Sequence, residues 1–186
     1  MKTLTIIIVL MLAFTLLCGC MTEAPESSPQ LSEVKLNSSH VNERVTLNAA
    51  MADLKIYLSE GEVSTENMTI HLVVGDGVNI SGMARTWTLG VTQNNIPSLF
   101  VYKNGGWRQT GWGDTFMDDA IDLNATLSPD ELYKMKSSVI GDEIRSPDPD
   151  LTETQLRLSG GVYSVSTRSE TGISELKFNA KTGELI

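Results

Sequence analysis

Apolar residues recur at helical spacing near the start of the folded region, and polar residues fill the positions between them. The stripe consists of Leu47, Ala50, Met51, Leu54, Tyr57 and Leu58. Thr46 stands where an N-cap is expected, and Gly61 follows the last apolar residue. The pattern predicts one amphipathic helix that begins after Thr46 and ends near Gly61.

After this helix the apolar positions alternate with polar ones, which is typical of strands. Strands are predicted at residues 68–74, 85–92 and 98–102. Two alternating sets are each expected to share one face of their strand: Met68, Ile70, Leu72 and Val74, and then Trp87, Leu89 and Val91. Asn104-Gly105 suits a tight hairpin turn, because both of its central residues need a positive φ. The first half is therefore predicted to be a helix followed by an antiparallel meander.

The second half has the same order of elements. Ser128 and Glu131 have the spacing of a capping box, with Pro129 at the first helical position. The helix is expected to end at Gly141, and its apolar stripe is Leu132, Met135, Val139 and Ile140. Strands are predicted at 151–158, 162–168 and 173–178. The fold class is thus α+β, with two helix-plus-antiparallel-meander units at residues 43–126 and 127–186.

The two halves can be compared directly. "WTLGVTQNNIPSLFVYKNGGW" (87–107) and "YSVSTRSETGISELKFNAKTGEL" (163–185) share the plan of strand, polar turn, strand and glycine turn. This order suggests an internal duplication, and unrelated meanders can also share it. Both explanations stay open at this point.

The C-terminal end carries a family resemblance. A strand runs into Asn179-Ala180-Lys181-Thr182-Gly183-Glu184-Leu185, and "LSPDELYKMKSSVI" lies ahead of it. These segments resemble the PepSY-type domain over about 60 residues, although the helix lacks the alanine-rich character common in that family. The resemblance implies a helix packed on a small antiparallel sheet, in an extracytoplasmic module that either binds a ligand or restrains a peptidase. A tandem PepSY-like repeat would follow if the halves are copies.

The N-terminus predicts an exported chain. Lys2 precedes a largely apolar run from Leu4 to Leu17, which has the length of a signal peptide and is shorter than a membrane span. Leu17-Cys18-Gly19-Cys20 resembles a prokaryotic lipobox, which implies cleavage after residue 19 and lipid on Cys20. The predicted location is the outer face of the cell membrane, reached through that lipid. The alternatives are an uncleaved anchor and a metal-binding Cys-x-Cys pair.

Residues 20–42 are rich in Ser, Pro, Glu and Asn and predict a disordered linker. Removing Lys2 from the 14 basic residues leaves 13 against 23 acidic ones, a net charge of −10, which argues against nucleic-acid binding. Four sequons fit an exported chain and make it a candidate glycoprotein: Asn37, Asn67, Asn79 and Asn124.

Candidate catalytic groups are few. The two histidines are His40, in the linker, and His71, which is expected to face solvent because it alternates out of phase with its apolar neighbours. With no thiol beyond the lipidated one, the sequence predicts no enzyme, no metal site and no cofactor. Acidic residues cluster at 114–122 and 142–150 without the spacing of a calcium loop.

Aromatic residues are the candidate ligand-binding groups. Tyr102, Trp107 and Trp112 lie around the first hairpin, and exposed aromatic side chains often mark binding sites. The simpler explanation is that these aromatic side chains fill the hydrophobic core. The leading hypothesis is a lipid-anchored binding module with a protein or peptide partner. The alternative is an envelope carbohydrate-binding protein or hydrolase that uses Trp107, Trp112 and the acids at 114–122, all lining one pocket.

Overall fold

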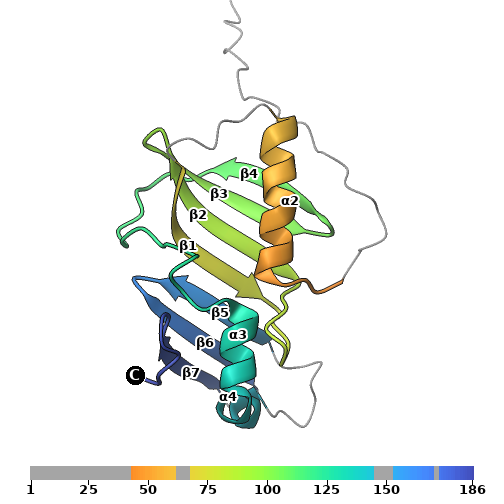
Figure 1. The fold of residues 1–186 in the computed structure, drawn as a ribbon, viewed down its shortest axis with the longest axis vertical. Coiled ribbons are helices and arrows are strands. Elements are labelled where there is room, and N and C mark those ends of the chain that lie inside the picture. The colour runs from red at the N-terminus through yellow and green to blue at the C-terminus, as the bar shows by residue number, and fades with distance from the viewer. Residues whose placement is uncertain (1–42, 62–67, 145–152, 170–171) are drawn as a thin grey trace, which may run out of the picture. The chain divides into compact units, whose positions relative to one another are not determined.

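The computed structural model describes residues 43–61, 68–144, 153–169 and 172–186. Two helical segments lie in front of one sheet of seven strands (Figure 1). The predicted signal peptide, Cys20, the linker and the sequons at Asn37 and Asn67 lie outside the described residues. The elements in chain order are α2 (Leu47–Glu60), β1 (Met68–Asp76), β2 (Thr86–Gln93), β3 (Ile96–Lys103), β4 (Gly106–Gly111), α3 (Pro129–Met135), α4 (Ser137–Ile144), β5 (Glu153–Ser159), β6 (Val162–Ser169) and β7 (Gly172–Asn179).

The two halves share a single antiparallel sheet, and this confirms the α+β class. The strand order is β4-β3-β2-β1-β5-β6-β7, so the first strand of each half lies at the centre. β1 and β5 pair from Val73 opposite Leu158 to Asp76 opposite Gln155. Each meander then extends outward from this junction in its own direction.

Helix α2 packs on the first half as its apolar stripe predicts. Thr46 is its N-cap and accepts a hydrogen bond from the Ala49 N–H, and Gly61 is its C-cap, both as expected. Trp107 on β4 is buried and its Nε1 donates to the Ala50 carbonyl at 2.8 Å. Large aromatic side chains and the helix stripe thus form one core under α2, in which Trp87, Leu89 and Val91 are also buried as predicted.

Helix α3 begins with the predicted capping box. The Ser128 hydroxyl accepts from the Glu131 N–H at 3.4 Å, and the Ser128 N–H donates to Glu131 Oε2 at 2.8 Å. Each of these two hydrogen bonds satisfies a backbone donor that the start of a helix leaves free. The Ser128 N–H and, in addition, the Ser128 hydroxyl donate to the Glu131 carboxylate and lower the pKa of this carboxyl.

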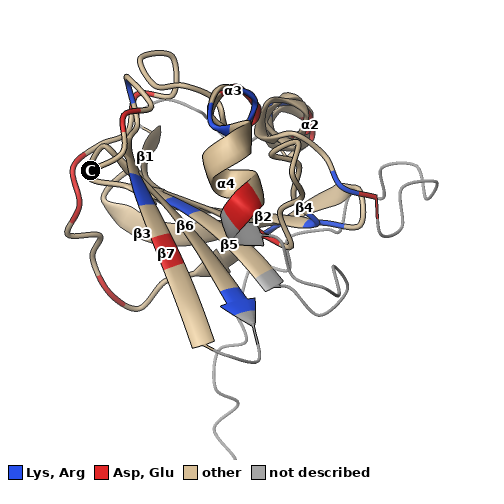
Figure 2. Ribbon diagram, turned by 90° about the horizontal axis from the view of Figure 1, so that it is seen from below, with Lys and Arg blue, Asp and Glu red and all other residues tan. Residues whose placement is uncertain are grey.

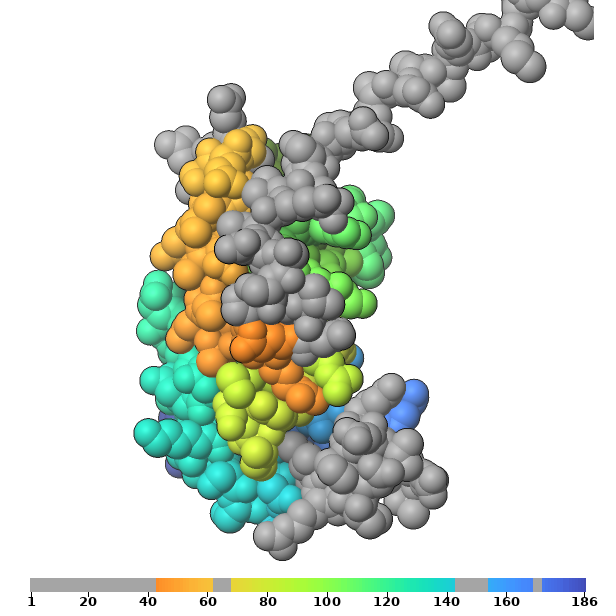
Figure 3. All heavy atoms as spheres, turned by 90° about the vertical axis from the view of Figure 1, so that its right-hand side faces the viewer, coloured from red at the N-terminus to blue at the C-terminus, as the bar shows by residue number. Residues whose placement is uncertain are grey.

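The rest of this helical segment differs from the prediction. The helix breaks at Lys136, and α4 continues through Gly141 to Ile144. Leu132 and Ile140 of the predicted stripe are buried as expected, whereas Met135 and Val139 are exposed and Tyr133 takes a buried position in the core. Figure 3 shows α2 and the α3–α4 segment along the same side of the molecule.

A close backbone contact connects α3 to the first half. A Cβ on Gly82 would lie 2.8 Å from the Asp130 Cα and from the Pro129 carbonyl oxygen, and Gly82 has a φ of +75°. Only glycine fits both the conformation and the space. The start of α3 therefore packs directly on the turn between β1 and β2.

The predicted single face of Met68, Ile70, Leu72 and Val74 is wrong. Ile70 pairs with Val91 and packs against the core, whereas Leu72 pairs with Gly90, because the register shifts between them. Such a bulge places two residues opposite one and moves the following side chains to the other face. Val73 consequently takes the buried position.

The polar turn at the C-terminus closes the chain back onto β7. Asn179 Oδ1 accepts from the Lys181 and Thr182 N–H groups, and Gly183 has a φ of +70°. Leu185 then bridges to Phe178. The tail thereby covers the last residues of this edge strand.

We expect the protein to lose stability at alkaline pH through its tyrosines. Burial raises the pKa of all four, and burial together with Asp53 raises that of Tyr102 to about 12. An unfolded tyrosine ionises near pH 10. The stability that these groups contribute is therefore complete below pH 10 and is lost as the pH rises toward 12. Urea midpoints, followed by circular dichroism, should be constant from pH 7 to 9 and should fall by pH 11.5.

Tyr133→Phe is the informative variant for this prediction. The Tyr133 hydroxyl is buried and has no hydrogen-bond partner among the described residues, so its removal should cost little at pH 7. The alkaline loss of the variant should be smaller than that of the parent. An identical loss in the two proteins would contradict the explanation.

Candidate functional site

The face of the sheet opposite the helices carries a row of polar side chains. Residues in register across five adjacent strands make up this row: Lys103 on β3, Thr86 on β2, Asp76 on β1, Gln155 on β5 and Ser166 on β6. Their strand neighbours Trp87, Tyr102 and Val165 are buried in the core. Since side chains alternate along a strand, the polar row lies on the side away from the helices.

A groove of about 700 Å³ follows this row. Basic side chains predominate among its charged residues: Arg85, Lys103 and Arg168 contribute positive charge and Asp76 is the one carboxylate of the lining. Asp76 Oδ1 accepts a hydrogen bond from Gln155 Nε2 at 2.8 Å. Figure 2 shows that β6 ends at a basic position. The groove is therefore polar and carries a positive balance of charge in an acidic chain.

The other end of the same face is covered by residues 112–121, which we call the strap. Phe116 lies over Gly90, where a Cβ would be 2.5 Å from the ring, and its ring stacks with those of His71 and Trp112. The Ile121 N–H donates to the Ile70 carbonyl at 2.7 Å. The absence of a side chain at Gly90 thus makes room for the strap on β2.

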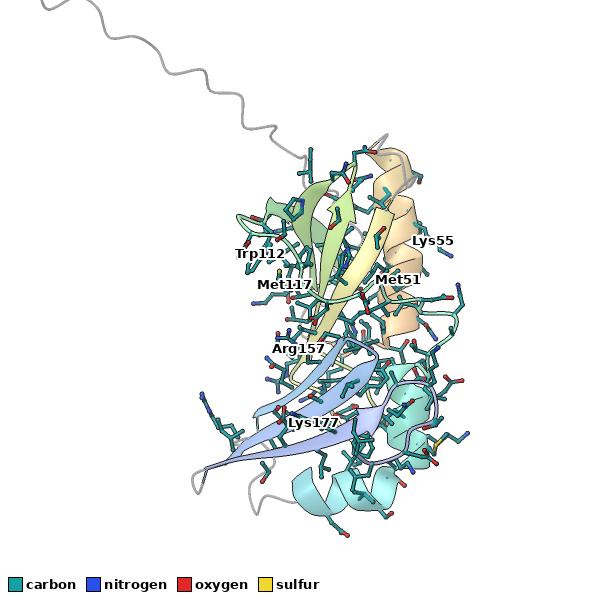
Figure 4. The ribbon with its side chains drawn as sticks, turned by 90° about the vertical axis from the view of Figure 1, so that its left-hand side faces the viewer. Met51, Lys55, Trp112, Met117, Arg157 and Lys177 are labelled. Atoms are coloured by element: carbon teal, nitrogen blue, oxygen red, sulfur yellow. The ribbon has the colours of Figure 1, made fainter. Side chains whose placement is uncertain are left out.

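Polar contacts hold the middle of the strap. His71 Nδ1 lies 2.9 Å from the Asp118 carbonyl oxygen, and because a carbonyl only accepts, this geometry fits a proton on Nδ1. Arg157 on β5 forms an ion pair with Asp118 at 3.8 Å. Figure 4 shows Trp112, Met117 and Arg157 on the side of the sheet opposite Met51 and Lys55 of α2. His71 therefore contacts the strap, whereas the sequence predicts that it faces solvent.

The structure brings Tyr102 and Trp107 together and places Trp112 apart from them. Tyr102 and Trp107 are buried beneath α2, where the Tyr102 hydroxyl donates to Asp53 at 3.1 Å and the two rings are 5.4 Å apart. Trp112 is 45% exposed and stacks on Phe116 on the opposite face. One pocket lined by Trp107 and Trp112 is therefore not present.

Two predicted glycosylation residues lie in the described part of the chain. Asn79 is half-buried, and its Oδ1 accepts from the Ser81 and Met83 N–H groups within a turn. Asn124 is exposed, next to the turn formed by Asp122. Of the two side chains, that of Asn124 is the more accessible to modification.

Sequence reasoning missed the polar groove. Each residue of the groove is an ordinary polar residue in a strand of alternating pattern. The periodicity shows only that its side chain faces away from the core. The polar row forms because Gln155 pairs with Asp76. This register depends on the pairing of two strands about 80 positions apart in the sequence. A sequence signal does exist, since Thr86, Lys103 and Ser166 all alternate with buried residues.

No family model, curated protein or solved structure matches this chain. The described helices include none that is long and apolar enough to cross a bilayer. In the same part of the chain, no three His, Cys, Asp or Glu side chains are arranged to hold a metal ion. The groove and the N-terminal sequence are therefore the features that point to a function.

We expect Gly90→Ala to loosen the strap. The added methyl group would overlap Phe116 and approach the Leu72 Cβ at 2.9 Å, and overpacking of this kind costs about 1–3 kcal/mol. Hydrogen exchange at the Ile121 amide should accelerate about tenfold or more. Gly111→Ala is the matched control, because nothing lies within 4 Å of its Cβ position. Unchanged exchange at Ile121 in Gly90→Ala would show that Phe116 does not hold the strap in place.

Proposed function

We propose that the protein is a lipid-anchored binding module outside the cytoplasm, which holds an extended segment of a protein partner on the open face of its sheet. The observation that carries this proposal is the groove that follows a polar row across five strands. Such a row offers hydrogen-bonding side chains at regular strand spacing. The module binds its partner without performing chemistry on it.

The anchor is supported by the sequence from Leu17 to Cys20. Acyl chains on Cys20 would hold the protein at the membrane by about 0.8 kcal/mol for each buried methylene. The linker at 20–42 would let the folded part stand away from the lipid. The partner is then a membrane or secreted protein on the same side of the membrane.

A tandem PepSY-like repeat is the proposed origin of the fold. In support, each half places a helical segment before its strands, and β1, β2 and β3 have the same order from the centre as β5, β6 and β7. The Asn179–Leu185 turn is the part that resembles the family. By that resemblance the partner is a peptidase, which the module would restrain.

The alternative of an envelope carbohydrate-binding protein or hydrolase lacks comparable support. It needs Trp107 and Trp112 in one pocket, and these residues lie on opposite faces of the sheet. Asp118, one of the acids that it would use, pairs with Arg157. We therefore do not advance it as a second function.

The anchor predicts a defined mass. Protein extracted from the native membrane should begin at Cys20 and carry a lipid increment, because the lipobox cysteine becomes the new N-terminus. Cys20→Ala should abolish both the increment and the recovery in the membrane fraction, and Cys18→Ala should retain them. An uncleaved chain without lipid would contradict the anchor.

If the partner binds on the open face, a photoreactive group on that face should crosslink to the partner and one on the helix face should not. A photoreactive amino acid at Ser166, in the groove, should give a defined crosslinked product in intact cells, whereas the same group at Lys55 on α2 should not. Filling the groove with Gln155→Trp should remove the product. Equal crosslinking from both positions would overturn the open face as the binding surface.

A further inference from the structure

We infer that the groove recognises an acidic segment of the partner, bound in an extended conformation across the strands. This inference rests on the proposed function and adds the chemistry of the ligand. Three properties of the groove carry it: the sign of its charge, the separation of its basic residues and the neutral polar row between them.

The charge of the groove opposes that of the chain. The protein has a net charge of −9, yet the groove is lined by Arg85, Lys103 and Arg168. Among the described residues, none of these three has an ion-pair partner. Asp76, the carboxylate of the lining, accepts a hydrogen bond from Gln155, and on the neighbouring strand β7 Glu175 pairs with Lys177 at 3.2 Å. Complementary charge therefore favours a negatively charged ligand.

The basic residues are spread along the groove. Lys103 lies on β3 and Arg168 on β6, four strand steps apart in the order β3-β2-β1-β5-β6. At about 4.8 Å for each step, their backbones are about 19 Å apart. One phosphate or carboxylate cannot contact both ends at once. An extended peptide that rises about 3.3 Å for each residue covers this distance with about six residues.

The surface between the basic residues suits a peptide. Thr86, Gln155 and Ser166 offer neutral donors and acceptors to backbone amide groups. Ile173, 67% exposed at the β7 end of the lining, offers an apolar contact to one side chain. The ligand therefore carries acidic residues about six positions apart, with polar or small residues between them.

Synthetic peptides test the inference on the full-length protein in detergent. The probe is a ten-residue Ser/Thr/Val peptide with Glu at positions 2, 5 and 8, and its counterpart carries Gln at those positions. Fluorescence anisotropy should detect binding of the Glu peptide, weakened as salt rises, and at least tenfold weaker binding of the Gln peptide. Equal binding of the two peptides, or no binding of either, would overturn the inference.

Variants locate the binding to the groove. Lys103→Gln and Arg168→Gln should each raise the Kd of the Glu peptide about threefold, and the double variant about tenfold, as expected for partly exposed charges. Lys55→Gln makes the same charge change on α2 and should leave the Kd unchanged. An equal effect of Lys55→Gln would show that only the net charge of the protein matters.

Two further outcomes separate this inference from the function on which it rests. If the Glu peptide fails to bind while the Ser166 crosslink persists, the acidic specificity is wrong and the binding module stands. If the crosslink also fails, the proposed function falls with it. Full competition by equimolar inorganic phosphate would likewise overturn the inference, because it would indicate a site for one small anion.

Discussion

The pairing of β1 with β5 is the interaction on which the rest of the structure depends. It joins two meanders, each headed by its own helical segment, at the residues from Val73 to Asp76 and from Gln155 to Leu158. Without this ladder, each half would expose the edge of its first strand and would end its sheet after three or four strands. With it, both helical segments contribute to one hydrophobic core, and the open face becomes continuous across seven strands.

The described helices cover only one face of the sheet, so the two faces can serve different purposes. The helices, Trp87 and Trp107 supply the buried apolar area, so the opposite face is free to carry polar groups. Among the described residues, the strap covers only part of that face, through Phe116 over Gly90 and Asp118 against Arg157. One face of the strands thus stabilises the fold, and the other is available for binding. Substitutions in the polar row should therefore leave the fold intact.

Local sequence patterns predicted the caps and turns of the helices and strands better than they predicted how these elements pair and pack. The cap at Thr46, the capping box at Ser128 and the Asn104-Gly105 turn involve neighbouring residues and were all confirmed. The bulge beside His71 was missed, because it shifts the phase of an alternating pattern that the sequence displays as regular. The helix break at Lys136 was missed, because no glycine or proline marks it in the sequence. The groove was missed for a different reason, since its residues meet only through the register of distant strands.

The contact at Gly82 joins the two halves of the chain through their backbones. Here the backbone at Pro129 and Asp130 lies so close to Gly82 that any side chain there would displace it. Neither half can therefore change at this contact independently of the other, because a residue larger than glycine at position 82 requires the start of α3 to move.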